Sequence, residues 1–306
     1  MVIELSRKIM IKRGVPQGSC LGPLLYNVGT DLSNHEELLN STVKFADDIC
    51  LVAHGKSINE VEAKLKSDYS TVKNQLKSRG LVFNISKFQL ILIGPGRRKV
   101  PKSYTIDLDG TSVPRSSEIT VLGVVLDEGL SYHSHTGKLL MHTKRKLNNL
   151  IRTCSHLPAQ CRNLASQTLI LSNLMYGDAV WAIYGQKTSE DLLRIQRKAA
   201  RWALWGIKGV QREADSHKSR PVCVSQLGWL PVTVNHKLNF AKRVWKSVRL
   251  GLSLPAPLRF NSEGTEEGAS RSWAARAARV WRSLPMQVKT CNNPQDFKTT
   301  YMIAAV

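Results

Sequence analysis

The pattern of apolar and polar positions predicts its clearest helix over residues 57–79. Apolar side chains recur there every three or four positions, which places them on one helix face. They are Ile58, Val61, Leu65, Tyr69, Val72 and Leu76. Ser57 and Glu60 have the S-x-x-E spacing of a capping box, and Gly80 follows as a stop signal. We therefore expect an amphipathic helix with one buried face.

Shorter apolar runs on either side of this helix predict strands. Residues 43–53 (VKFADDICLVA) hold two β-prone runs around an acidic pair, which is the pattern of a hairpin. Residues 90–93 and 120–126 are two further strand-like runs. A turn over residues 14–18 leads into an apolar stretch with helical spacing. Alternating strands and helices are typical of α/β or α+β domains.

From about residue 136 onward the pattern becomes helical. We predict helices over 136–151, 164–184 (buried, broken by Gly177), 189–205 (with Ser189 as N-cap), 234–250 and 271–283. Residues 207–220 are expected to form a polar loop. The chain is thus expected to be an α+β protein, divided as follows: an α+β part over 1–130, a helical region over 131–252, a linker over 253–271 and a basic C-terminal segment over 272–306.

Charge is concentrated in the second part of this 306-residue chain, whose formal net charge is +21. Residues 1–130 hold 17 basic and 14 acidic residues, whereas residues 131–306 hold 27 and 9. All seven tryptophans also lie after residue 131. A basic region interleaved with aromatic residues favours a nucleic-acid partner. The alternative is a basic solvated surface with tryptophans in the core behind it.

Composition excludes several other classes of protein. The chain is 42% hydrophobic and 22% charged, as ordinary globular proteins are. No apolar run approaches the roughly 18 residues that cross a bilayer, so no membrane partner is expected. The six scattered cysteines form no C-x-x-C pair. Together with the lack of a secretory leader pattern, they predict an intracellular protein, of the nucleus or the cytoplasm.

The acidic pair Asp47-Asp48 is the first candidate for chemistry. Adjacent carboxylates repel each other, and carboxylates together with substrate phosphates hold Mg²⁺. In a regular strand, neighbouring side chains point to opposite faces, but a hairpin turn relaxes this rule. Acidic pairs in exposed turns are common, however, so the pair alone is weak evidence.

The surrounding motifs change this interpretation. Phe45-Ala46-Asp47-Asp48 follows an unbroken segment over residues 14–26, GVPQGSCLGPLLY. This order resembles the reverse transcriptases of non-LTR (LINE-type) retrotransposons, whose palm carries both motifs. Residues 84–87 (NISK) resemble the N-x-x-K motif of that family. Residues 121–127 (VLGVVLD) resemble its primer-grip strand.

The resemblance implies a partial reverse-transcriptase palm over 1–130, followed by a mostly α-helical thumb and C-terminal region. It implies the following roles: Asp47 and Asp48 as catalytic, Mg²⁺-binding residues; Pro16, Gln17 and Gly18 lining the nucleotide pocket; Lys87 near the triphosphate; Leu122 and Gly123 in the primer grip. The partners implied are an RNA template, a DNA primer and deoxynucleoside triphosphates. Structural alternatives remain for these residues: glycine turns, a solvated lysine, and a strand with a bulge.

Several departures from the family pattern predict an incomplete site. The family has a further catalytic aspartate upstream of the GVPQG segment, but Glu4 is the only acid before Gly14. Gly29 interrupts a helical stretch, and Phe88 replaces a small hydroxyl residue. We therefore expect a truncated copy or a partial gene model with exposed sheet surface and marginal stability. The function expected is RNA-directed DNA polymerase. The alternative is a non-catalytic, basic nucleic-acid-binding remnant, in which residues 271–282 contact nucleic acid or form a packed surface helix.

Overall fold

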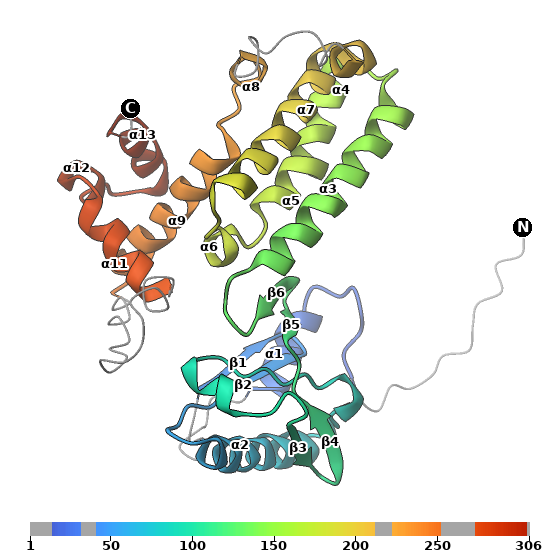
Figure 1. The fold of residues 1–306 in the computed structure, drawn as a ribbon, viewed down its shortest axis with the longest axis vertical. Coiled ribbons are helices and arrows are strands. Elements are labelled where there is room, and N and C mark those ends of the chain that lie inside the picture. Colours follow the sequence, from blue (N-terminus) through green and yellow to red (C-terminus); the bar gives the residue numbers. More distant parts are fainter. Residues whose placement is uncertain (1–13, 32–40, 212–221, 252–272, 305–306) are drawn as a thin grey trace, which may run out of the picture. The chain divides into compact units, whose positions relative to one another are not determined.

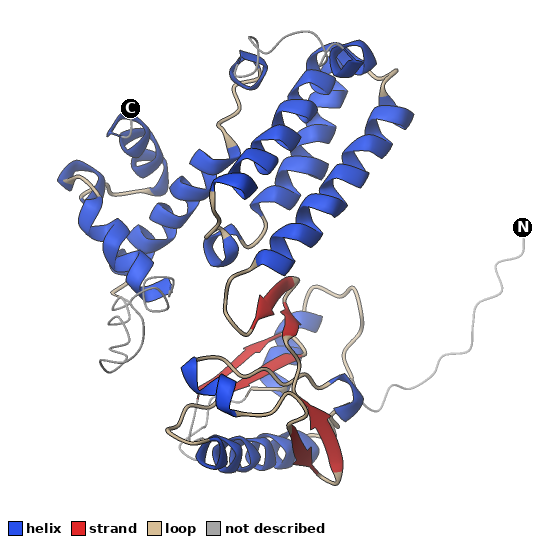
Figure 2. Cartoon of the chain, in the orientation of Figure 1, coloured by secondary structure: helices blue, strands red, loops and turns tan. Residues whose placement is uncertain are grey.

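A computed structural model describes residues 14–31, 41–211, 222–251 and 273–304 (Figure 1). The chain divides into two compact units. The N-terminal unit comprises Met1–Leu90 and Gly96–Ser116, and the C-terminal unit comprises Ile91–Pro95 and Ser117–Val306. Figure 2 shows helices together with small two-stranded sheets, which confirms the mixed α+β character. The linker expected over 253–271 lies outside the described residues.

The N-terminal unit combines one long helix with two hairpins. Its elements are α1 (Gly22–Gly29), β1 (Ser41–Phe45), β2 (Asp48–Val52), α2 (Ile58–Ser78), η1 (Ile85–Lys87), η2 (Pro95–Lys99), β3 (Thr105–Leu108) and β4 (Thr111–Pro114). β1 pairs with β2 and β3 with β4, both antiparallel. The strand predicted over 90–93 is wrong. Leu90 makes a single bridge to Arg115, and Gly94-Pro95 ends the apolar run before a ladder can form.

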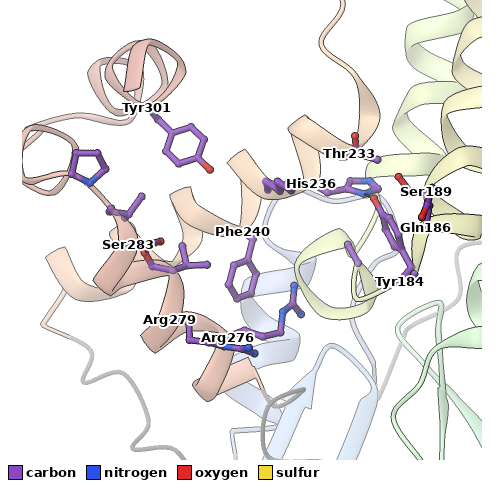
Figure 3. A pocket seen from close by; sticks show the side chains of 16 residues that line it. Tyr184, Gln186, Ser189, Thr233, His236, Phe240, Arg276, Arg279, Ser283 and Tyr301 are labelled. Carbon is purple, nitrogen blue, oxygen red and sulfur yellow. Dashed lines mark hydrogen bonds between the residues drawn. The ribbon is translucent and has the colours of Figure 1, made fainter. Parts of the chain in front are cut away.

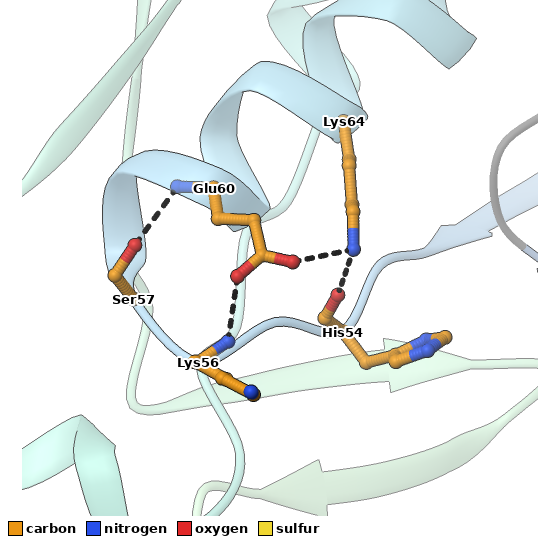
Figure 4. Close-up of polar contacts among 5 residues, drawn as sticks. All are labelled: His54, Lys56, Ser57, Glu60 and Lys64. Atoms are coloured by element: carbon orange, nitrogen blue, oxygen red, sulfur yellow. Dashed lines mark hydrogen bonds and ion pairs between the residues drawn. The ribbon is translucent and has the colours of Figure 1, made fainter.

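Helix α2 follows the sequence prediction closely. The Ser57 hydroxyl accepts a hydrogen bond from the Glu60 amide at 3.2 Å, as a capping box requires (Figure 4). The Glu60 carboxylate departs from that motif, because it accepts from the Lys56 amide at 2.9 Å and pairs with Lys64 at 2.7 Å. These contacts, Lys64 first, lower the pKa of Glu60. The N-terminus of α2 is thereby fixed to the segment after β2.

An aromatic cluster forms the core between α2 and the second hairpin. Tyr69, Phe83 and Phe88 lie 5.5–6.0 Å apart, measured between ring centroids. The Tyr69 hydroxyl donates to Asp109 in the β3–β4 turn, and burial together with this carboxylate raises the pKa of Tyr69 to about 12. Phe88 therefore has a packing role, which accounts for an aromatic ring at this position.

The C-terminal unit starts with a hairpin and is otherwise helical. Its elements are β5 (Glu118–Val121), β6 (Val124–Asp127), α3 (His133–Cys154), α4 (Ala159–Ser166), the π-turn η3 (Gln167–Leu171), α5 (Ser172–Met175), α6 (Asp178–Trp181), α7 (Gln186–Gln211), α8 (Val222–Gln226), α9 (Val232–Arg249), α11 (Trp273–Ser283), α12 (Met286–Lys289) and α13 (Pro294–Ala304). Among the helices of these ranges, none has the length and apolar character of a membrane span.

Three predictions in this unit need correction. The run over 120–126 forms two strands around a turn instead of one strand. Helix α7 begins at Gln186, so Ser189 lies in its first turn, where its amide donates to the Gly185 carbonyl at 3.1 Å. Gly206 interrupts α7 with a φ of +61° and a ψ of −145°, next to the predicted end at 205, but residues 207–211 are helical again where a loop was expected. The break at Gly177 is confirmed, because this residue has a φ of +64° between α5 and α6.

Most tryptophans of this unit are core residues. Trp181 and Trp202 are 0% exposed, and Trp229 and Trp245 are also buried. Trp205 is 51% exposed. The tryptophans of the basic region are therefore explained mainly by packing in the core, which is the alternative interpretation of the composition.

A buried glutamine joins two helices of this core. Gln196 of α7 is 0% exposed. Its side-chain amide donates to the Leu230 carbonyl at 2.7 Å, and its carbonyl accepts from the Val232 amide at 2.8 Å. The Val232 amide is one of the first amides of α9, which have no partner inside the helix, so this side chain satisfies one of them together with the carbonyl just before the helix.

Candidate functional site

The β1–β2 hairpin presents both candidate aspartates. Phe45 pairs with Asp48 at the end of the ladder, so Ala46 and Asp47 form a two-residue turn. Ala46 has a φ of +52°, an uncommon conformation for a residue other than glycine. Asp47 and Asp48 are both exposed. The hairpin predicted around the acidic pair is confirmed.

The two faces of this hairpin differ. Ile49 and Leu51 pack toward Val72 and Leu76 of α2. The opposite face carries apolar side chains that are open to solvent: Val43 (59% exposed), Phe45 (63%) and Val52 (50%). Asp48 pairs directly with Phe45, so its side chain shares this open face. The expected exposure of sheet surface is thus observed.

The two carboxylates have the donor chemistry that Mg²⁺ requires. Within the ranges that the structure describes, neither side chain takes part in a hydrogen bond or an ion pair, so all four oxygens are available. The same ranges contain no group of three acidic, histidine or cysteine residues able to hold a metal ion. Mg²⁺ is commonly held by one or two carboxylates plus substrate phosphates. Asp47 and Asp48 fit that arrangement.

The predicted nucleotide-pocket residues lie in a tight turn before α1. Gly14 and Gly18 have φ values of +96° and +80°. The Ser19 hydroxyl donates to the Pro16 carbonyl at 3.0 Å and accepts from the Gly22 amide at 2.9 Å, which closes the turn onto the helix. Pro16, Gln17 and Gly18 are exposed.

A lysine on β1 connects α1 to the hairpin. The Lys44 ammonium donates to the Thr30 carbonyl at 2.6 Å and lies 5.5 Å from the centroid of the Tyr26 ring. Burial lowers the pKa of Lys44, against the opposing effect of Asp31. Helix α1 and the hairpin therefore form one assembly. In the described part of this unit, no hydrogen bond or ion pair joins residues 16–18 to either carboxylate.

Lys87 ends the short helix η1 and is exposed. Its amide donates to the Asn84 carbonyl at 3.1 Å, and the Ser86 hydroxyl donates to the Asn84 side chain at 2.6 Å. These bonds fix the backbone of the turn. The Lys87 ammonium bonds to no residue of the described segments. Lys87 is thus placed as a solvent-accessible cation of the N-terminal unit.

Leu122 and Gly123 form the turn of the β5–β6 hairpin, which belongs to the C-terminal unit. Their φ values are +47° and +78°. The Tyr176 hydroxyl donates to the Leu122 carbonyl at 2.7 Å, and a Cβ at Gly123 would lie 3.3 Å from the Tyr176 ring. The structure therefore adds Tyr176 as a residue that holds this turn. No sequence signal links it to a residue 54 positions away.

Residues 2–126 match the family described as reverse transcriptase (RNA-dependent DNA polymerase). This segment is therefore similar in sequence to reverse transcriptases. The match covers both the aspartate hairpin and the turn at Leu122-Gly123.

Several proteins of insect mobile elements are similar to this chain. The chain is 24% identical over 223 residues to the probable RNA-directed DNA polymerase from transposon X-element of Drosophila melanogaster, covering 70% of this chain and 24% of that protein. It is 26% identical to the corresponding protein from transposon BS of the same organism, covering 63% of this chain and 22% of that one. A type-1 retrotransposable element R1 protein of Nasonia vitripennis is 26% identical, covering 79% of this chain and 58% of that protein. No solved structure matches.

These relatives make the chain a distant homologue of non-LTR retrotransposon polymerases. The resemblance inferred from its motifs is confirmed. The chain spans about a quarter of the length of the X-element and BS proteins.

A buried histidine supports the β5–β6 hairpin of this reverse transcriptase homologue. His135 is 7% exposed, and its Nδ1 accepts from the Val125 amide at 3.3 Å. The centroid of its ring lies 5.3 Å from that of the Trp181 ring, and its Nε2 has no hydrogen-bond partner among the described residues. Burial and then the nearby Lys138 charge lower the pKa of His135. The imidazole is therefore neutral, with Nδ1 as the acceptor.

Acidification is expected to destabilise the C-terminal unit through His135. In the unfolded chain the His135 imidazole takes up a proton near pH 6.5, whereas in the folded unit its pKa is lower. The free energy of unfolding therefore falls as pH drops below about 6.5. One proton limits the slope to about 1.4 kcal/mol per pH unit. Urea unfolding at several pH values, compared with His135→Asn, isolates this group from His236. Parallel pH profiles for the two proteins would contradict the prediction.

Proposed function

We propose that the chain acts in RNA-directed DNA synthesis and extends a DNA primer on an RNA template from deoxynucleoside triphosphates. One observation carries this proposal. The β1–β2 hairpin, in the segment that matches the reverse transcriptase family, presents two adjacent carboxylates that bond to no described residue. Exposed acidic pairs are common in turns, and it is the match of residues 2–126 to a reverse transcriptase family that supports assigning Mg²⁺ to this pair. The proposal also places the protein inside the cell, where its substrates are.

The roles of the other residues in this proposal follow the family motifs. Asp47 and Asp48 hold Mg²⁺, which when bound offsets the negative charge of the triphosphate. Pro16, Gln17 and Gly18 line the nucleotide pocket, and the exposed ammonium of Lys87 lies near the triphosphate. Leu122 and Gly123 support the primer end, with Tyr176 holding their turn.

The proposed domains keep the boundaries expected from sequence. Residues 1–130 serve as the palm, and residues 131–252 as a thumb-like helical region. Residues 253–271 connect this region to the basic segment over 272–306. Within the described ranges no third metal-ligating residue groups with Asp47 and Asp48, so a further metal ligand would come from outside these ranges.

Primer extension tests the proposal directly. The purified chain is incubated with oligo(dT) annealed to poly(rA) and with labelled dTTP, in Mg²⁺ or in excess EDTA. We expect incorporation in Mg²⁺ that the chelator abolishes. Folded protein that incorporates nothing in Mg²⁺ would contradict the proposal and would favour the non-catalytic nucleic-acid-binding alternative, for which the excess positive charge of residues 131–306 is the supporting observation.

A further inference from the structure

A cleft of about 940 Å³ opens in the C-terminal unit (Figure 3). Its walls come from α9, α11 and the segment where α6 leads into α7. Basic and aromatic side chains line it, among them Tyr184, His236, Lys237, Arg276, Arg279 and Tyr301. No aspartate or glutamate is among its lining residues. The cleft is large by the standard of small-molecule sites, which span about 300–1,000 Å³.

Two arginines of α11 make the cleft wall strongly cationic. The Arg276 guanidinium lies 4.2 Å from the centroid of the Phe240 ring. Burial lowers the pKa of Arg276 to about 10, Tyr132 opposes this shift, and the charge of Arg279 adds a smaller lowering. The Arg276 guanidinium donates to the Ala179 and Val180 carbonyls at 3.4 and 3.5 Å, but it forms no ion pair with a described residue, so a nearby anion would stabilise its charge. An anionic ligand in the cleft would supply that negative charge.

The N-terminus of α7 adds partial positive charge to the same cleft. Gly185, Gln186 and Ser189 lie in its lining. The Ser189 amide makes the first bond of the helix, to the Gly185 carbonyl at 3.1 Å, so the amides before it have no partner inside the helix. The dipole of α7, which runs unbroken from Gln186 to the kink at Gly206, favours an anion at this end.

Ring side chains give the cleft a second kind of surface. The Tyr184 hydroxyl is hydrogen-bonded to Nδ1 of His236 at 2.7 Å, and Nε2 of His236 lies 2.8 Å from the Leu174 carbonyl. These bonds fix both rings, of which His236 is buried (4% exposed) and Tyr184 is partly exposed. Tyr301 stacks on Phe297, with ring centroids 5.8 Å apart. Grooves for single-stranded nucleic acid combine a cationic track for phosphates with rings on which bases stack.

We propose that this cleft binds a single-stranded nucleic acid through its phosphodiester backbone. The cations and the helix end contact phosphates, while the partly exposed rings of Tyr184 and Tyr301 contact bases. A free phosphate shares the anionic chemistry, but it would fill only a small part of the cleft and would leave the rings without a ligand. The site lies within the C-terminal unit, so its binding does not depend on polymerase activity.

Matched charge-neutral variants test the cleft. Lys237→Gln with Arg279→Gln removes two exposed cations of the cleft, and Arg243→Gln with Lys246→Gln removes two exposed cations of α9 outside it. Fluorescence anisotropy measures binding of a labelled poly(U) oligonucleotide of about 12 nucleotides, which is within known site sizes. Salt is varied between about 50 and 200 mM.

We expect the affinity of the cleft variant for the oligonucleotide to be lower than that of the unaltered protein by roughly 10-fold or more. The affinity of the control variant should fall by less than about 2-fold, given the usual free energies of charged contacts. The salt slope of the cleft variant should fall by about 1.4, since each phosphate contact on a single strand contributes about 0.7. Circular dichroism confirms that both variants fold.

Three results would overturn the proposal: no binding of the oligonucleotide by the unaltered protein, equal loss in the two double variants, or displacement of the oligonucleotide by equimolar inorganic phosphate. The last result would identify the cleft as a site for free phosphate. Because no step of this experiment measures DNA synthesis, its failure is distinguishable from failure of the primer-extension test.

Discussion

Asp47→Asn is expected to lower Mg²⁺-dependent primer extension by about 100-fold or more. The substitution keeps the size of the side chain but removes a negative charge and weakens an oxygen ligand of the cation. A bound metal commonly contributes several kcal/mol to phosphoryl transfer, and each 1.36 kcal/mol is a factor of about ten in rate. Because Asp47 is exposed and bonds to no described residue, the fold should be unaffected.

Asp107→Asn is the matched control for this experiment. Asp107 is an exposed carboxylate in β3, in the same unit but on the other hairpin. Its side chain accepts from the Gly110 amide at 3.2 Å, a bond that asparagine can also make. The control should retain full incorporation. Equal incorporation by the Asp47 variant and the unaltered chain would show that this carboxylate is not a metal ligand.

Trp202→Ala is expected to lower the free energy of unfolding of the C-terminal unit by about 3–5 kcal/mol. Trp202 is 0% exposed, and its indole Nε1 donates to the Ser155 hydroxyl at 3.0 Å. The substitution leaves a large cavity in the core and removes the donor from Ser155. Urea unfolding followed by circular dichroism at 222 nm would measure the change.

Trp205→Ala, one turn along the same helix, provides the comparison. Trp205 is 51% exposed, so its truncation should cost less than about 1 kcal/mol. The pair separates burial from the loss of an aromatic side chain as such. Similar losses in both variants would mean that α7 is packed differently from the arrangement described here.

The parts of the fold that sequence predicts well are those with a local cause. The spacing of apolar residues and the Ser57–Glu60 cap place α2 within one residue of its observed ends. The aspartate hairpin is also recognisable, because two β-prone runs flank a two-residue turn. The roles of its carboxylates, however, come from motif resemblance and stay predictions.

The errors arise where a distant contact or an unusual backbone decides the structure. The β5–β6 turn places Leu122 at positive φ, a conformation that leucine seldom adopts, so Gly123 alone marks this turn in the sequence. The Tyr176 hydroxyl stabilises this turn from a distant segment. Gln196 is a second case, since its burial depends on backbone groups 34 and 36 positions away.

The distribution of tryptophan gives the two units different optical properties. All seven indoles lie in the C-terminal unit, and four of them are buried there. Intrinsic emission excited at 295 nm therefore reports on that unit alone, while the unit with the aspartate hairpin contributes none of it. Tryptophan emission would thus not report events confined to the hairpin, and a dye or an added indole would be needed to observe them.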